Sequence, residues 1–264
     1  MKVLFLGDVF GKPGRQAVVR CVPRLIVGQG IDLVVVNGEN AAGGAGITPD
    51  AAEELLAAEV DLLTSGNHIW AKREIIPYLE RPGARLLRPA NYPPGSPGRG
   101  RAVIETPDGR KLGVLNVEGR VFMKNLDDPF RTAEAELAAL RAAGAVAVLV
   151  DMHCEATSEK AAMAVFLDGR VSAVVGTHTH VQTSDERILP GGTAFITDVG
   201  MCGPNDSIIG MKKEPVLERF LTQRPSAFEP ARGDVWLQGA ILDLDEESGK
   251  ARAIVRVQER LGDL

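Results

Sequence analysis

The sequence predicts an α/β fold built from βαβ units around a largely parallel sheet. Short runs rich in β-branched residues alternate with amphipathic segments of helical periodicity, the pattern that βαβ units produce. Of the 264 residues, 45% are apolar and only 5% are aromatic, which is typical of a well-buried α/β core. No repeat, low-complexity segment or internal boundary interrupts this pattern. We therefore expect one domain over residues 1–264.

The first half of the chain supplies three expected strands and three helices. Strands are expected at 2–7, 32–40 and 60–68, and helices at 15–30, 48–59 and 72–80. The second helix begins clearly, because Thr48 suits the N-cap and Pro49 the first helical position. Residues 88–101 hold four of the sixteen prolines. They predict a long connection or a mobile lid, and the sheet resumes after them.

The second half continues the alternation and then changes to antiparallel pairs. Two strands are expected at 101–106 and 111–119, followed by a helix over 129–144 that ends at a glycine. Strand 146–155, helix 158–169 and strand 171–180 come next. Two antiparallel pairs close the chain: RILP with GGTAFIT, and VWLQGAILDLDEESGKARAIVRV around its EESGK turn.

Composition narrows the class of function. The net charge is −5 and no basic stripe is present, so we expect no binding of duplex nucleic acid. An anionic substrate would need a local positive charge, which a metal ion can supply. The apolar runs have strand length and no signal-peptide cleavage pattern follows the amino terminus, so no membrane segment is expected. Three widely spaced cysteines favour a reduced, cytoplasmic protein.

Polar side chains follow five of the expected strands. Ligands of open α/β sheets bind outside the carboxyl ends of the strands, so these side chains are expected to meet. All four histidines of the chain belong to this group. Its members are Asp8, Glu39, Asn40, Asn67, His68, His153, His178 and His180. Imidazole and carboxylate ligands without cysteine favour zinc, manganese or iron over calcium.

Each of these residues has a structural explanation when it is taken alone. Asp8 could cap the segment that follows it, and Asn67 could support a turn. His153 could be a satisfied core histidine, and an isolated H-x-H pair is commonly a surface feature. Glu39 and Asn40 could belong to an ordinary loop. Cys154 alternates away from His153 in an extended chain, so we expect a buried small hydrophobic residue there rather than a ligand.

Together the motifs resemble those of the calcineurin-like metallophosphoesterases. N-G-E-N at 37–40, G-N-H at 66–68 and G-T-H-T-H at 176–180 are similar to the successive blocks of that superfamily. Two positions differ: Phe10 stands where a histidine is usual, and Glu39-Asn40 where an aspartate is usual. With GDVFGKPGR, TSGNHIW, LLRPANYP and ITDVGMCGP, these departures resemble the YmdB-like branch of phosphodiesterases over essentially the whole chain.

The resemblance implies a layered α/β sandwich of the metallophosphoesterase type, with central mixed or mostly parallel sheets flanked by helices. It also implies two metal ions (iron, manganese or zinc) and a division of the ligands. Asp8, Glu39, Asn40 and His180 would hold one ion; Glu39, Asn67, His153 and His178 would hold the other. His68 would be the catalytic residue that is not a ligand.

The resulting hypothesis is a phosphodiesterase acting on a small anionic substrate, with 2′,3′-cAMP or 3′,5′-cAMP as candidates. A hydroxide bridging the metals would attack phosphorus in line with the leaving oxygen, to which His68 would give a proton. A phosphomonoesterase or nucleotidase on the same site, or a nucleotide-sensing regulatory protein without catalysis, remain alternatives. A Rossmann cofactor site is disfavoured because GDVFGKPGR lacks G-x-G-x-x-G. Homo-oligomerisation is common in such enzymes and is left open by the sequence.

Overall fold

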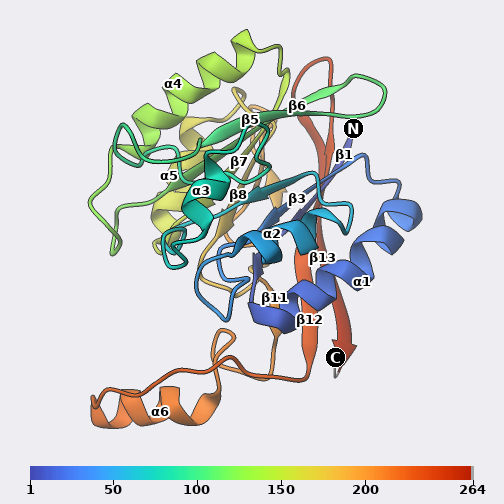
Figure 1. The fold of residues 1–264 in the computed structure, drawn as a ribbon. Helices are drawn as coiled ribbons and strands as arrows, with labels where there is room; N and C mark the ends of the chain where they lie inside the picture. The colour runs from blue at the N-terminus through green and yellow to red at the C-terminus, as the bar shows by residue number, and fades with distance from the viewer. Residues whose placement is uncertain (263–264) are drawn as a thin grey trace.

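In the computed structural model, which describes residues 1–262, two β-sheets pack face to face and helices cover their outer faces (Figure 1). The first sheet contains, in spatial order, β2 (Asp8–Val9), β11 (Met201–Pro204), β12 (Val235–Leu244), β1 (Lys2–Leu6), β3 (Leu33–Asn37) and β4 (Leu62–Thr64), with β13 (Ala251–Gly262) paired to β12. The second contains β5 (Arg101–Glu105), β6 (Lys111–Glu118), β7 (Ala147–His153), β8 (Ala173–Thr177), β10 (Ala194–Ile196) and β9 (Arg187–Ile188). This arrangement confirms the predicted layered sandwich of mixed sheets.

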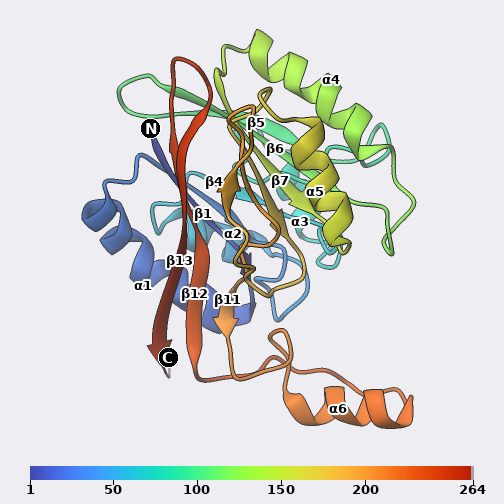
Figure 2. The same ribbon diagram turned by 180° about the vertical axis from the view of Figure 1, so that it is seen from behind.

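Side-chain alternation along the strands explains the layers. In β1, Val3 and Phe5 face a buried cluster that contains residues of both sheets. Leu4 and Leu6 face the opposite way, into a cluster with α1 (Gly11–Gln29) and α2 (Pro49–Leu56). A third cluster joins the second sheet to its two helices, α4 (Pro129–Ala142) and α5 (Thr157–Phe166), which Figure 2 shows from behind. The short α3 (Ile75–Leu79) packs against the same cluster as α1 and α2.

Most elements follow the sequence prediction, with differences at the ends. Helix α1 begins at Gly11 rather than near residue 15. Gly14 allows the first turn to pack closely against β11, because a Cβ there would lie only 2.2 Å from the carbonyl oxygen of Cys202. Both expected antiparallel pairs are present, β9 with β10 and β12 with β13. In residues 1–262 no helix combines the length and the apolar character needed to cross a membrane.

One segment that the sequence pattern did not predict projects from the body. Residues 205–234, which we call the arm, leave the first sheet after β11 and return to it at β12. They contain α6 (Lys213–Thr222), which stands apart from the sandwich in both views (Figures 1 and 2). By contrast, residues 88–101 fold onto the body: the backbone N–H of Ala90 donates to the carbonyl oxygen of Asn116 at 2.8 Å, and Nδ2 of Asn91 donates to that of Glu118 at 2.8 Å, both in β6.

The strand register brings the polar strand ends to one edge of the sandwich. β1, β3 and β4 run parallel in the first sheet, and Asn37 lies beside Thr64. β6, β7 and β8 run parallel in the second sheet, and His153 lies directly beside Thr177. The residues that follow these positions therefore emerge together, between the two sheets.

Candidate metal centre

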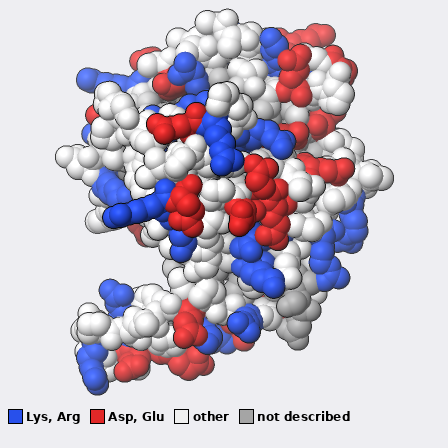
Figure 3. Space-filling model, in the orientation of Figure 1, with Lys and Arg blue, Asp and Glu red and all other residues white. Residues whose placement is uncertain are grey.

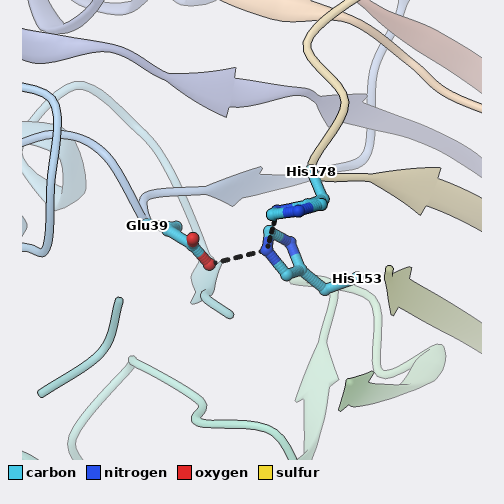
Figure 4. A group of neighbouring side chains, drawn as sticks. All are labelled: Glu39, His153 and His178. Atoms are coloured by element: carbon cyan, nitrogen blue, oxygen red, sulfur yellow. Dashed lines mark hydrogen bonds and ion pairs between the residues drawn. The ribbon is translucent and has the colours of Figure 1, made fainter. Parts of the chain in front are cut away.

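Four of the predicted ligands meet at Nε2 of His153. This atom lies 2.9 Å from Oε2 of Glu39, 3.0 Å from Oδ1 of Asn67 and 3.1 Å from Nδ1 of His178. Figure 4 shows the two imidazoles and the Glu39 carboxylate turned toward one another, and their ligand atoms all lie within 4.8 Å. An imidazole nitrogen carries at most one proton and cannot donate to all three neighbours. Lone pairs that converge in this way suit a cation.

The remaining predicted ligands lie directly beside this group. Nε2 of His180 is 3.7 Å from Oδ1 of Asp8 and 3.1 Å from Nδ2 of Asn40. The other oxygen of Asp8 accepts a hydrogen bond of 3.0 Å from the backbone N–H of His178, so the two groups share a wall. The structure thus brings together all seven residues that the sequence nominated as ligands.

A hydrogen-bond relay sets the tautomer of His153. Oγ1 of Thr177 lies 2.7 Å from Oδ1 of Asp151 and 2.9 Å from Nδ1 of His153. The hydroxyl of Thr177 donates to Oδ1 of the fully buried Asp151, whose other oxygen accepts from the hydroxyl of Thr64. The hydroxyl oxygen then accepts from Nδ1–H of His153, and Nε2 keeps its lone pair toward Glu39.

The other two histidines are oriented in the same way. Nε2 of His178 lies 3.2 Å from a carboxylate oxygen of Glu155, so Nδ1 is the nitrogen that faces the centre. Nδ1 of His180 lies 2.9 Å from the carbonyl oxygen of Ile209, so its Nε2 faces the centre. Each ring therefore has one nitrogen on an outer acceptor and one lone pair directed inward, as metal-ligating histidines do.

Because these side chains are buried, their charged forms are unfavourable unless a cation is bound among them. Burial raises the pKa of Glu39 to about 7 and lowers the pKa of His153 to about 4 and that of His178 to about 3. It also raises the pKa of Asp8, an effect that the nearby charge of Glu39 adds to. Oδ1 of Asp8 and both oxygens of Glu39 are buried and have no hydrogen-bond donor. A divalent cation would compensate these oxygens, so the residues fit a metal centre bound by nitrogen and oxygen.

The two alternating histidines reach the centre by a different route from the expected one. The sequence analysis expected a strand that runs to residue 180, but β8 ends at Thr177. His178 and His180 instead adopt positive φ values of 95° and 64°, which are costly for residues with a Cβ. The buried Asp198 holds the turn, since its Oδ2 accepts from the backbone N–H and the hydroxyl of Thr179 at 3.1 and 2.6 Å.

Phe10, the departure from the usual histidine, packs beside the centre. Its ring meets that of His180 edge to face, with centroids 5.7 Å apart. Gly44 and Gly210 approach the same ring with positive φ, and a Cβ at either would lie 2.7 Å from it. Phe10 therefore fixes the position of the His180 ring and leaves no room there for another ligand. Cys154, as expected, is buried and turned away, with Sγ 3.3 Å from the carbonyl oxygen of Ala156.

His68 occupies the open side of the centre. Its Nε2 is 3.9 Å from Oε1 of Glu39, and its side chain is 45% exposed, whereas Glu39 is fully buried. A cavity of about 520 Å³ lies in front of it. One end of this cavity is lined by Glu39, Asn40, His68, His178 and His180, and the other by residues of the arm. His68 can thus meet a molecule that enters the cavity.

Several supporting residues were not nominated from the sequence. Asp151 and Thr177 orient His153, and their places at strand ends were the available signal. Asp198 follows β10 in the motif ITDVG, which the sequence analysis quoted without giving this residue a role. Nothing in the sequence marks Lys160, whose fully buried ammonium lies 2.8 Å from Asp198. Glu118, at the end of β6, is another buried carboxylate: burial raises its pKa to about 7, and the charge of Glu39 adds to this effect.

Comparison with known proteins identifies relatives along almost the whole chain. A family model described as YmdB-like protein matches residues 4–257. The 2′,3′-cyclic-nucleotide 2′-phosphodiesterase of Bacillus subtilis (strain 168) is 47% identical over 257 residues, which cover 97% of this chain and 96% of that protein.

Two crystal structures are similar in fold as well as in sequence. A hypothetical protein from Thermus thermophilus is 45% identical with a TM-score of 0.92, and the match covers 98% of this chain and 99% of that one. A novel phosphatase from Mycoplasma pneumoniae is 32% identical with a TM-score of 0.92, covering 100% of this chain and 94% of that one. The sandwich and its length are therefore shared with these relatives.

Proposed function

The chain belongs to the YmdB-like family, and from this premise we propose that it is a metal-dependent phosphoric diester hydrolase. The observation that carries the proposal is the convergence at Nε2 of His153, where a carboxylate, a carboxamide and a second imidazole present acceptor atoms to one point. Unless a cation binds there, these acceptor lone pairs face one another without a donor between them.

The ligands divide as the family resemblance implies. Asp8, Glu39, Asn40 and His180 would hold one ion; Glu39, Asn67, His153 and His178 would hold a second. Bound divalent ions supply the positive charge that attracts a phosphodiester and stabilises the charge on its phosphoryl oxygens. Only two ligands, Asp8 and Glu39, are carboxylates. The histidines and asparagines are neutral, so the centre keeps a positive charge in a chain whose net charge is −5.

His68 acts as the general acid. Its side chain is the most exposed imidazole of the group and reaches the cavity where the leaving oxygen departs. A proton given from His68 to that oxygen contributes roughly 10²–10⁴ in rate. The other three histidines cannot serve in this way, because each has one nitrogen on an outer acceptor and the other directed at the metal centre.

The substrate we propose is a small cyclic nucleotide, with a 2′,3′-cyclic phosphodiester favoured by the activity named for the Bacillus subtilis relative. The test is turnover of bis-p-nitrophenyl phosphate, 2′,3′-cAMP and 3′,5′-cAMP by protein loaded with manganese or iron. Elemental analysis accompanies each assay. Protein that binds metal and hydrolyses none of these diesters would overturn the proposal.

A phosphomonoesterase activity is the second candidate, since the similar Mycoplasma pneumoniae protein is described as a phosphatase. Adding p-nitrophenyl phosphate and 3′-AMP to the substrate panel separates the two. We expect the diesters to have the higher kcat/KM, and a consistent preference for the monoesters would reassign the function.

A further inference from the structure

One wall of the cavity in front of the metal centre is apolar and belongs to the arm. The arm contributes Ile208, Ile209, Met211, Val216, Arg219, Phe220, Gln223 and Phe228. Figure 3 shows the hollow between the arm and the body. The cavity therefore has two chemically different ends: one with the candidate metal ligands, and one with aromatic and aliphatic side chains.

At its base, the arm is hydrogen-bonded to a residue of the candidate metal centre. The carbonyl oxygen of Ile209 accepts from Nδ1 of His180 at 2.9 Å. The two segments that connect α6 to the first sheet are joined by backbone hydrogen bonds. The N–H of Ala231 donates to the carbonyl oxygen of Gly210 at 2.8 Å, and that of Lys212 to the carbonyl oxygen of Glu229 at 2.9 Å. The apolar wall is consequently positioned by the same histidine that faces the metals.

Planar side-chain groups are concentrated on this wall. The guanidinium of Arg219 lies over the ring of Phe228, 5.2 Å from its centroid. Phe220, on the same helix, is 72% exposed although it lines the cavity. An aromatic ring left in water beside a polar site is a place where a planar ligand gains by stacking. The carboxamide of Gln223 adds a group able to hydrogen-bond a planar heterocycle at its edge.

We propose that the arm forms the nucleobase subsite of the enzyme. This inference rests on the proposed function and names the part of the substrate that the arm recognises. The phosphodiester lies at the metal centre, and the base stacks against Phe220 and Phe228 of the arm. A cavity of about 520 Å³ is within the usual range for sites that hold a small ligand. The arm thereby favours nucleotides over phosphodiesters that carry no aromatic base.

The test compares two five-membered cyclic phosphodiesters, 2′,3′-cAMP and the base-free glycerol 1,2-cyclic phosphate. In the double variant Phe220→Ala/Phe228→Ala we expect the ratio of kcat/KM for 2′,3′-cAMP to that for the base-free diester to fall about tenfold or more. Phe220→Tyr keeps a ring and should keep the ratio. Leu221→Ala is the matched control, because Leu221 lies on the same helix, is 83% exposed and does not line the cavity.

Each outcome separates the subsite from the function it depends on. An unchanged ratio in the double variant, or an equal loss on both substrates, would overturn the subsite while leaving the hydrolase intact. If wild-type protein with bound metal hydrolyses neither diester, the proposed function fails instead. Calorimetric binding of 2′,3′-cAMP to metal-loaded wild-type and double-variant protein then decides the subsite directly. An affinity that does not fall in the double variant refutes it.

Discussion

Gly66→Ala should disable the metal centre without removing a ligand. A Cβ on Gly66 would lie 1.8 Å from Oε2 of Glu39 and 2.2 Å from Nε2 of His153, whereas ordinary contact begins at 3.4 Å. Each group must therefore move by more than 1 Å. Both are fully buried, so neither can turn toward solvent. The φ of Gly66 is not positive, so the added methyl group, and not the backbone, causes the change.

The expected size of the effect follows from this displacement. A shift of ~1 Å in a catalytic arrangement costs about 10²-fold in rate, and overpacking of a buried site costs roughly 1–3 kcal/mol of stability. We expect kcat for bis-p-nitrophenyl phosphate to fall by about that factor in Gly66→Ala, together with the metal content of the purified protein. Mass spectrometry gives metal per chain, kinetics across a manganese titration gives kcat, and circular dichroism gives Tm.

Gly28→Ala is the matched control for Gly66→Ala. No atom lies within 4 Å of a Cβ at Gly28, which belongs to α1. We expect full metal content and turnover there, with stability raised by about 0.5–1 kcal/mol because alanine is favoured over glycine in a helix. The reasoning is refuted if Gly66→Ala retains the metal content and turnover of Gly28→Ala, since the space beside Glu39 would then not be the metal site.

Three further predictions concern the centre and its support. His68→Ala should keep nearly normal metal content while turnover falls ~10²–10⁴-fold, and loss of metal would instead make His68 a ligand. His178→Ala should lower metal occupancy itself, and elemental analysis that finds full occupancy would contradict its assignment. Lys160→Met should destabilise the protein by about 3–5 kcal/mol in urea unfolding, because it leaves the buried Asp198 uncompensated. Adding Asp198→Asn should recover much of that loss, and an undiminished loss in the double variant would argue against the ion pair as its cause.

Removal of the metal should also be visible in stability. A cation that binds only the folded state adds ~2.7 kcal/mol when its concentration is 100 times Kd, so a chelator should lower Tm and readdition of manganese should restore it. A Tm that is unchanged by both the chelator and the added metal would mean that no cation binds the folded protein under those conditions.

The local pattern of the sequence was enough to predict most helices and strands of the fold and the residue types of the centre, whereas the layered sandwich was implied by the family resemblance. β1 could be read from KVLFLG because burial on two faces selects an uninterrupted apolar run. Glu39, Asn67 and His153 could be nominated because they follow such runs, and parallel strands end at a common edge. These inferences need only the periodicity of a segment and the residues next to it.

The tertiary structure decided what the side chains do at that edge. His153 and Thr177 are neighbours only because the register of β7 and β8 places them side by side, and this contact sets the imidazole tautomer. The hydrogen bond from the backbone of His178 to Asp8 joins residues 170 positions apart.

The turn at His178–His180 and the arm were also beyond the local pattern. Positive φ at two histidines opposes local preference and is held by Asp198, a residue from another strand end. Helix α6 exposes much of its apolar surface, so it lacks the buried stripe by which a helix is recognised in a sequence. Sequence periodicity reports which face of an element is buried, whereas the partners of buried polar atoms depend on contacts between segments that only the complete fold brings together.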